Sequence, residues 1–510
     1  MKKKKESIIN KEKIKIIVFC LLVSFVTLLF CSKNSPLYPM NDWGDENAFF
    51  TVARSWLHGI IPYKDIFEQK GPVLYLIFLV ASLISSKSFI GVFIIEVLFY
   101  ATFAYLIGKI SDLYLKKEFK FIIIPLILTF IASTKAFAHG GSAEEFVLPM
   151  LTYFIYKMLV FFKTDELTRK DLIILGFIAG LIALIKYTLL GLPFIFMASI
   201  FFIYLFRKEY KKAILNCIYF LIGMGLPIFI FLVYFICTRA LSEFIEEYIM
   251  INIKYYPSNY TLSEKFGKIC KYLYNTIKSN GVYTYILLIA NILLIYGKAI
   301  FKNKKEKVIY VLMILFAIIG IYWGCLFIPY YFLGLELFLI LPTIYIFKLL
   351  EKKITFNKKN IIIATIIVLI ISIINFSNYQ YKYFSKVKKE DLAQYKFAKI
   401  MNKKKDATLL NYMFLDGGFY LAADIDPTIF AFEKQNIDFN KYPYLDNMQN
   451  IAILEKKVDF VVMRLSKYYK EIPDFVLENY KIVSTKKQKF EDINFEYVLL
   501  EKIEDEEDNN

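Results

Sequence analysis

The feature of this sequence that most constrains its fold is a series of long apolar runs. Several of them have the length of about 17–25 residues that crosses a lipid bilayer, and lysine-rich connectors separate them. The chain of 510 residues is 57% hydrophobic, well above the usage of soluble proteins. We therefore expect a polytopic α-helical membrane protein with about eleven spans, near residues 16–32, 88–108, 120–134, 146–162, 171–186, 188–206, 213–237, 281–297, 308–328, 330–347 and 360–376.

The formal net charge of +17 has three candidate explanations, namely nucleic-acid binding, binding to anionic lipids and membrane topology. The lysines gather in the short connectors, which is the pattern of the positive-inside rule and excludes a nucleic-acid partner. All of these connectors fall on one side if the apolar segment 73–86, which is short for a crossing, does not span the membrane. We therefore expect the N-terminus in the cytoplasm, the C-terminus outside, and segment 73–86 on the outer face of the cytoplasmic membrane.

On this topology, the acidic loops and the C-terminal part of the chain lie outside the cell. Residues 1–384 form the transmembrane domain, and its first outer loop covers residues 33–87. Residues 385–503 carry only short apolar runs between polar, helix-compatible stretches, which predicts a small soluble α/β domain. An acidic tail, residues 504–510, follows. The short apolar runs are 407–413, 428–432, 458–463, 480–483 and 495–500.

The loop segment 42–75, directly after the first span, is crowded with charged and aromatic side chains. Asp45 and Glu46 open a helix-compatible stretch, and the helix dipole alone would favour acids there. The functional interpretation is a carboxylate base at the membrane surface, with basic side chains beside it to meet a charged lipid head group. The candidate site residues of this loop are Asp45, Glu46, Arg54, Tyr63, Glu68 and Lys70.

The order of these residues, from Asp45-Glu46 to Lys70-Gly71-Pro72 before a short apolar helix, resembles a known family. It looks like the bacterial members of glycosyltransferase families 39 and 83 in the GT-C superfamily, which include protein O-mannosyltransferases and lipid A aminoarabinose transferases. The resemblance implies a GT-C-like fold and a polyprenyl-phosphate-linked sugar donor. It further implies that Asp45 is the general base and that Lys70 holds the donor phosphate. Gly71 stands where the family often has proline, a departure that leaves the backbone beside Lys70 less rigid.

Three motifs in later outer turns resemble the same family. Glu144-Glu145 matches its second acidic loop, although a solvated span boundary would also place acids there, and which of the two is functional stays open. Lys186 matches a lysine turn of the family. A lysine on the outer side departs from the positive-inside trend, which favours contact with a phosphate or a carboxylate. The alternative explanation is that the side chain extends to the membrane surface, as lysines at span ends commonly do. Tyr330 and Tyr331 match a late Tyr-Tyr pattern, and the alternative explanation is an interfacial aromatic belt.

The implied reaction is transfer of a hexosyl or pentosyl group from the lipid-linked donor to a hydroxyl group of a glycan, lipid or protein acceptor. One attack assisted by one base predicts inversion at the anomeric carbon. The six cysteines are scattered and there are two histidines, so the spacing indicates no metal knuckle. A requirement for a divalent metal stays open.

Other function classes fit a polytopic chain as well. A transporter or flippase of lipid-linked glycans would carry charges inside its spans and show repeat symmetry, and Glu96 and Glu336 are the main acids of that kind here. A polymerase of lipid-linked repeat units would share the outer-face site. A scaffold without catalytic activity would need none of the acidic motifs.

Overall fold

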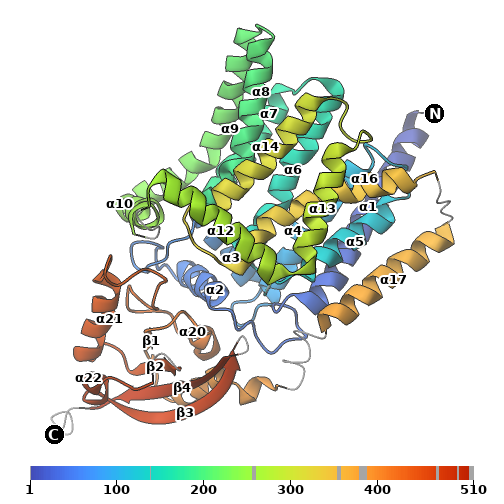
Figure 1. The fold of residues 1–510 in the computed structure, drawn as a ribbon. Coiled ribbons are helices and arrows are strands. Elements are labelled where there is room, and N and C mark those ends of the chain that lie inside the picture. Colours follow the sequence, from blue (N-terminus) through green and yellow to red (C-terminus); the bar gives the residue numbers. More distant parts are fainter. Residues whose placement is uncertain are drawn as a thin grey trace. The chain divides into compact units, whose positions relative to one another are not determined.

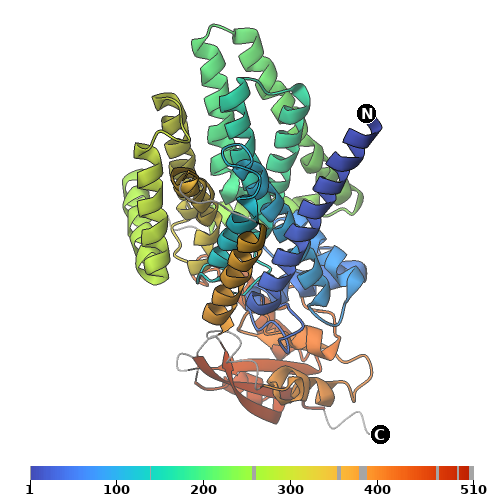
Figure 2. The ribbon, with the colours of Figure 1, turned by 90° about the vertical axis from the view of Figure 1, so that its right-hand side faces the viewer.

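The computed structural model describes residues 2–137, 139–255, 260–352, 358–377, 387–466, 470–490 and 493–504 (Figures 1 and 2). The chain divides into two compact units. Unit 1 comprises residues 1–35, 93–231 and 258–382, and unit 2 comprises residues 36–92, 232–257 and 383–510. The expected tail 504–510 lies outside the described residues except for its first position.

Unit 1 is built from helices, and each of the eleven expected apolar runs falls on helical structure (Figure 1). Helix α4 begins with residues assigned to unit 2, and α9 ends with residues assigned to unit 2. The helices are α1 (Lys2–Cys31), α4 (Ile90–Ser111), α5 (Lys120–Ala132), α6 (Ala143–Thr164), α7 (Arg169–Lys186), α8 (Gly191–Phe206), α9 (Tyr210–Cys237), α12 (Leu262–Asn280), α13 (Val282–Tyr296), α14 (Lys304–Tyr322), α15 (Leu333–Glu336), α16 (Ile340–Leu350) and α17 (Lys358–Ser377).

Among the described residues, six helical stretches are long and apolar enough to cross a membrane, and the bent pair α12–α13 would be a seventh. The protein is therefore a polytopic membrane protein. One stretch of 38 residues, Arg169–Phe206, holds both α7 and α8. Arg207, just past α8, pairs with Asp165, just before α7, at 2.6 and 2.8 Å. The chain therefore turns back between the two helices, and two of the expected spans share this stretch.

The connectors of unit 1 gather at its two ends as the charge pattern predicts. At one end, the Lys116 amide donates to the Glu351 carboxylate at 3.0 Å, which joins two lysine-rich connectors. At the other end, the Lys33 amide donates to the His139 carbonyl at 2.9 Å, which joins two expected outer loops. Which of these ends faces the cytoplasm stays a prediction.

Unit 2 combines three segments that are distant in sequence. Its helices in the first two segments are α2 (Gly44–Leu57), α3 (Pro72–Ile84), α10 (Leu241–Phe244) and α11 (Asn252–Lys254), and a π-helix, Ile245–Ile251, connects the last two. Helix α3 covers the apolar segment 73–86. Its 13 residues span about 20 Å, less than the hydrocarbon core of a bilayer, which is about 30 Å thick.

The C-terminal segment contributes a four-stranded sheet with the order β1-β2-β4-β3. Strand β1 pairs with β2 in parallel, and β4 pairs antiparallel with β2 and β3. This confirms the predicted α/β architecture. The elements are α19 (Ala393–Met401), β1 (Leu409–Tyr412), α20 (Phe419–Ala423), α21 (Tyr444–Leu454), β2 (Phe460–Leu465), α22 (Asp474–Leu477), β3 (Tyr480–Phe490) and β4 (Ile493–Lys502).

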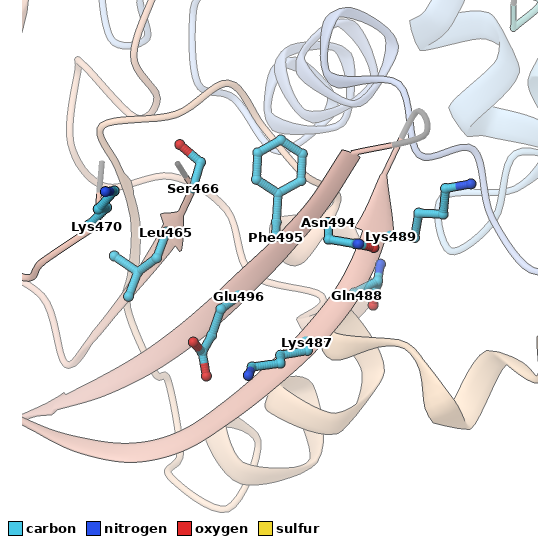
Figure 3. Close-up of a pocket in the computed structure, with 9 residues that line it drawn as sticks. All are labelled: Leu465, Ser466, Lys470, Lys487, Gln488, Lys489, Asn494, Phe495 and Glu496. Carbon is cyan, nitrogen blue, oxygen red and sulfur yellow. The ribbon is translucent and has the colours of Figure 1, made fainter. Parts of the chain in front are cut away.

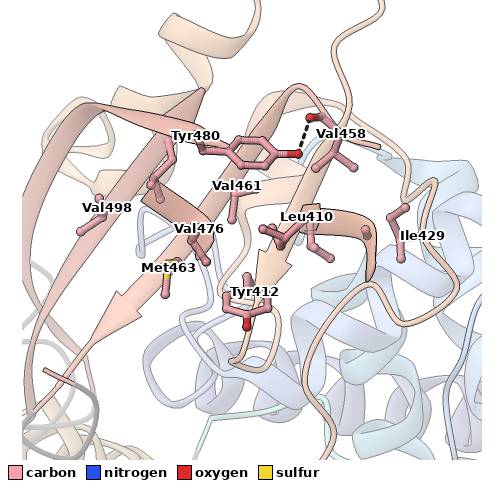
Figure 4. Close-up of a cluster of buried hydrophobic side chains, with 12 residues drawn as sticks. Leu410, Tyr412, Ile429, Val458, Val461, Met463, Val476, Tyr480 and Val498 are labelled. Atoms are coloured by element: carbon pink, nitrogen blue, oxygen red, sulfur yellow. Dashed lines mark hydrogen bonds between the residues drawn. The ribbon is translucent and has the colours of Figure 1, made fainter. Parts of the chain in front are cut away.

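One face of this sheet carries the apolar core of the segment (Figure 4). Because side chains alternate along a strand, Val461 and Met463 of β2 point to the same face. Val476 of α22 and Ile453 of α21 are buried against them. The Tyr480 hydroxyl donates to the Val458 carbonyl at 2.9 Å, which satisfies a polar group inside this core. Whether residues 385–503 fold on their own stays a prediction.

Candidate functional site

The two acids that open α2 have different surroundings. Helix α2 begins at Gly44, so Asp45 and Glu46 lie in its first turn, where the helix dipole favours carboxylates. Glu46 is fully buried and accepts a hydrogen bond from the Asn41 amide group. Asp45 is only partly buried. Of the two, Asp45 is the carboxylate that an acceptor molecule can reach.

The loop before α3 is held by two tyrosine hydroxyl groups. The Tyr63 hydroxyl donates to the Lys70 carbonyl at 2.6 Å, and the Lys70 amide donates to the Tyr75 hydroxyl at 3.1 Å. Tyr63 has a φ of 71°, in the left-handed region that non-glycine residues rarely adopt. The Lys70 ammonium group lies 5.6 Å from the centre of the Phe49 ring. The hydrogen bonds of the Lys70 amide and carbonyl groups therefore fix the position of the Lys70 Cα atom, from which its side chain extends.

Glu68 shares this loop and lies next to other charges. It is 3% exposed, and its carboxylate accepts a hydrogen bond from the Gln69 amide at 2.5 Å. Burial raises the pKa of Glu68 above its ordinary value, the Lys70 charge opposes that rise, and the Asp45 charge adds to it. Asp45, Glu68 and Lys70 are therefore close enough to interact electrostatically.

A third carboxyl group, that of Glu433, joins this group from the C-terminal segment. Burial raises the pKa of Glu433 well above its ordinary value, and the nearby charges of Glu68 and Asp45 contribute to the rise. The Glu433 carboxylate accepts hydrogen bonds from the Asp416 amide at 2.5 Å and from the Gln435 side chain at 2.7 Å. The sequence gives no local signal for Glu433, because it is separated from the loop by more than half of the chain.

The π-helix of unit 2 carries another buried acid that sequence reasoning missed. Burial raises the pKa of Glu247 to about 10. The π-helix contacts the same loop, because the Asn252 side chain donates to the Gln69 carbonyl at 2.7 Å. Segments of π-helix are rare and often lie at functional sites.

Arg54 is turned inward and does not face an open site. It is 1% exposed, and its guanidinium group donates to the Ile425 carbonyl at 3.0 Å. Its nitrogens lie 3.5 Å from the carboxylates of Asp424 and Asp426. The His58 ring lies 2.6 Å from Asp426 as well. These contacts hold the turn of residues 424–426 against α2, so the geometry favours a structural role for Arg54.

In unit 1, the structure brings together all the residues expected from the later motifs except Glu145. Lys186 forms an ion pair with Glu144, at the start of α6. The Lys186 ammonium group lies 3.5 Å from the centre of the Tyr331 ring and 5.7 Å from that of Tyr330. A cation over an aromatic face is stabilised by the ring quadrupole, and most strongly where water is excluded.

The ends of three helical elements place Lys186, Glu144 and the two tyrosines close together. The Ser142 hydroxyl caps α6 by accepting from the Glu145 amide at 3.1 Å, which places both glutamates in the first turn. Lys186 stands where α7 gives way to the 3₁₀ turn Tyr187–Leu190. Tyr330 and Tyr331 belong to a second 3₁₀ turn, Pro329–Phe332. A charge cluster thus forms where three helical elements begin or end.

An apolar groove of about 480 Å³ lies between α7, α8 and α9. Along α8 it extends from Leu190 to Phe202, a distance of about 18 Å at the rise of an α-helix. Leu190 follows Lys186 by a single turn of chain, so one end of the groove lies near the charge cluster. The groove walls are Ala179, Leu190, Pro193, Phe194, Met197, Ala198, Phe201, Phe202, Cys217, Phe220, Leu221 and Met224.

A second hollow, of about 610 Å³, lies on the sheet of unit 2 (Figure 3). Lys470, Lys487 and Lys489 line it together with Glu496. Lys487 is the direct partner of Glu496 across strands β3 and β4, so part of the positive charge is compensated. None of the residues predicted from the sequence lines this hollow.

The residues that the structure describes contain no group of three or more histidine, cysteine, aspartate or glutamate side chains placed to hold a metal ion. The described residues therefore add no support for a divalent metal.

Comparison with known proteins gives a distant structural likeness. Neither a protein-family model nor a curated protein matches the sequence. The chain is similar to two crystal structures of ArnT from Cupriavidus metallidurans, one bound to undecaprenyl phosphate and one in the apo state. Sequence identity is 12% and 11%, the TM-scores are 0.47 and 0.45, and each match covers 96% of this chain and 98% of the other.

ArnT is an aminoarabinose transferase, one of the groups that segment 42–75 resembles. A likeness with so low an identity and TM-score identifies neither an activity nor a ligand for this chain. The function proposed below therefore depends on this chain's own residues.

Proposed function

We propose that the protein is a glycosyltransferase that moves a sugar from a polyprenyl-phosphate donor to an acceptor hydroxyl group at the outer face of the cytoplasmic membrane. The observation that carries this proposal is the meeting of Asp45, Glu68 and Lys70 in unit 2. This group offers a reachable carboxylate and a lysine in one place. Those are the base and the phosphate-binding cation that such a transfer needs.

In the proposed reaction, the acceptor oxygen attacks the anomeric carbon as the bond from that carbon to the phosphate oxygen breaks. The Asp45 carboxylate takes the proton of the acceptor hydroxyl group. The electron pair of the broken bond stays on the polyprenyl phosphate, and the Lys70 charge stabilises the negative charge that develops there. A single displacement inverts the configuration of the sugar.

The buried acids around Asp45 fit this role. Burial raises the pKa values of Glu68 and Glu433, and nearby carboxyl groups add to both shifts. Asp45 is the member of the group that keeps access to solvent. We infer that Asp45 is the carboxylate of this group that an acceptor hydroxyl group can approach.

Features of unit 1 suit a lipid-linked donor. The apolar groove along α8 has the length for several isoprene units of a polyprenyl chain, and one of its ends lies near Lys186. An apolar path of this length suits the hydrocarbon chain of a lipid-linked donor. We propose this groove as the binding surface of the donor's chain.

Transfer from purified donors tests the function. Purified protein is mixed with a panel of radiolabelled polyprenyl-phosphate hexoses and pentoses and with glycan, lipid and protein acceptors. Asp45→Asn is expected to lower kcat by about 10²–10⁴-fold, the usual contribution of a general base. Asp391→Asn, an exposed aspartate of unit 2, serves as the matched control. Full activity of Asp45→Asn would remove the proposed mechanism.

The proposed orientation has its own test. Reporter domains fused after Leu113 and Gly141 are expected to report the cytoplasm and the exterior, respectively. Reporters found on the same side would contradict the topology, and with it an outer-face site.

A transporter remains the second candidate, because unit 1 buries several acids among its helices. Glu96, Glu145 and Glu336 are at most 2% exposed, and buried intramembrane acids are typical of proton-coupled carriers. Reconstituted vesicles that move a lipid-linked glycan across the bilayer, without any transfer of sugar, would favour this function.

A further inference from the structure

A buried pair of carboxyl groups lies beside the start of α6 in unit 1. The Ser32 hydroxyl, just past the end of α1, donates to both oxygens of Glu96 on α4, at 3.1 and 2.9 Å. The Gly141 amide donates to one oxygen of Glu145, Oε2, at 2.9 Å. Both glutamates are at most 1% exposed. Three segments of the chain thus converge on two acids.

The two carboxyl groups are in hydrogen-bonding contact with each other. No N–H or hydroxyl group of the described residues donates to the second oxygen of Glu145, Oε1. Two carboxylates at this distance in an apolar interior cannot both be ionised, because like charges repel strongly at low dielectric constant. A proton on one of the two carboxyl groups would supply the missing donor, and the pair would then share it.

The loop at Gly140 packs closely against the carboxyl pair. Gly140 has a φ of +85°, and a Cβ atom at this position would lie 2.3 Å from the Ser32 hydroxyl oxygen and 2.5 Å from a Glu96 oxygen. The loop can therefore approach the pair this closely only because residue 140 is glycine. The contact of Gly141 with Glu145 follows from this approach.

The pair decides which way α6 presents its two successive glutamates. Neighbouring residues on an α-helix point about 100° apart. Because Glu145 is bound by Glu96 and Gly141, Glu144 is the one that turns toward Lys186. The chemistry of the two residues is identical, so only these contacts distinguish them.

We propose that Glu144 is the functional acid of this motif, and that Glu96 is a positioning residue that holds Glu145, and with it the first turn of α6, in place. Ser32 supports Glu96 in this role. The proposal rests on the proposed transferase function for the role given to Glu144. The pair itself is independent of that function, and the two can be tested separately.

The first experiment measures the pair without any activity assay. Thermal unfolding of detergent-solubilised protein is compared for wild type, Glu96→Ala, Glu145→Ala and the double variant. The expected result is coupling, in which the double variant loses clearly less than the sum of the two shifts in Tm. Glu96→Gln is expected to restore most of the loss seen with Glu96→Ala, because a neutral amide can donate to Glu145 as a protonated carboxyl group does. Additive shifts in Tm would contradict the coupling of Glu96 and Glu145. A Glu96→Gln variant no more stable than Glu96→Ala would contradict it as well.

The second experiment measures transfer. Glu144→Gln is expected to lower kcat by about 100-fold, and Glu145→Gln by less than about 5-fold. Glu96→Ala is expected to lower kcat by about 10-fold with little change in KM, and Glu96→Gln to recover most of that loss. A Glu145→Gln variant as impaired as Glu144→Gln would overturn the assignment.

The outcomes separate this inference from the proposed function. If the wild-type protein transfers no sugar from any donor while the unfolding cycle shows coupling, the transferase function is removed, and the role of Glu144 with it. The shared-proton pair then stands as the anchor of α6. If transfer occurs but the cycle is additive, the transferase function stands and the positioning role of Glu96 is removed.

Discussion

The ammonium group of Lys186 and the carboxylate of Glu144 form an ion pair between α7 and α6, with 12% and 1% of the two side chains exposed. An isolated charge in this position would be poorly hydrated. Lys186→Met is therefore expected to destabilise unit 1 by about 3–5 kcal/mol, because it leaves Glu144 buried without its partner. Thermal unfolding in detergent measures the loss.

The double variant Lys186→Met/Glu144→Gln separates stability from function. It removes both charges, so most of the lost stability is expected to return. Sugar transfer is expected to stay about 100-fold below wild type, because we propose that Glu144 is a functional acid of the reaction. Recovery of transfer together with stability would mean that the pair is only structural.

Arg54 gives a prediction about unit 2. Arg54→Met removes the hydrogen bond to the Ile425 carbonyl and the charge between Asp424 and Asp426. The two acids keep access to water, so the expected loss is moderate, about 1–3 kcal/mol. Lys87→Met is the matched control, because Lys87 pairs with the same Asp424 at 3.0 Å but is 77% exposed. It is expected to change stability by less than about 0.5 kcal/mol.

The buried acid of the π-helix predicts a pH dependence. Burial, with further charge from Glu68, raises the pKa of Glu247 from 4.5 in the unfolded chain to about 10 in the folded protein. Between these values the folded protein holds a proton that the unfolded chain releases. The free energy of unfolding therefore falls as pH rises, by at most about 1.4 kcal/mol per pH unit.

Glu247→Gln removes this dependence. The variant is expected to lose less Tm than wild type between about pH 6 and about pH 9. Glu246→Gln, the exposed neighbour, is the control and is expected to follow wild type. Parallel curves for Glu247→Gln and wild type would show that Glu247 is ionised in the folded protein.

If the groove along α8 binds the donor's chain, a change in the groove is expected to alter KM and not kcat. Ala198→Trp fills part of the groove, so KM for a long-chain polyprenyl donor is expected to rise about tenfold with kcat nearly unchanged. A donor with a short, water-soluble chain should not be affected. Phe229→Trp on the exposed face of α9 is the control. Equal KM values for Ala198→Trp and wild type would exclude the groove as the chain's binding surface.

The sequence predicted what depends on local pattern. Runs of apolar residues determine where helices form, and the turn at Lys186 appears as expected because short polar breaks end such runs. Four of the five short C-terminal runs, 407–413, 458–463, 480–483 and 495–500, overlap strands β1, β2, β3 and β4, respectively. The run 428–432 is no strand, although it is apolar. Its carbonyl groups accept hydrogen bonds from outside the sheet: the Tyr420 hydroxyl donates to the Phe432 carbonyl and the Phe67 amide to the Phe430 carbonyl, both at 3.0 Å.

The arrangement of the site depends on contacts that no local pattern encodes. Arg54 and Ile425 are 371 positions apart, and a basic residue in a loop looks the same whether it binds a ligand or a distant turn. Glu433 joined the acidic group without any sequence signal for the same reason. Glu144 and Glu145 show the limit most clearly, because their roles differ only through Glu96, Gly141 and Lys186.

Unit 2 draws on residues 36–92, 232–257 and 383–510, and this has a consequence for biosynthesis. The ribosome synthesises residues 36–92 long before residues 383–510. Asp45 and Lys70 therefore lack Glu433 while most of the remaining polypeptide is made and inserted. A nascent chain therefore carries the loop but not its completed surroundings. Assembly of the acidic group becomes a late event, tied to the end of translation.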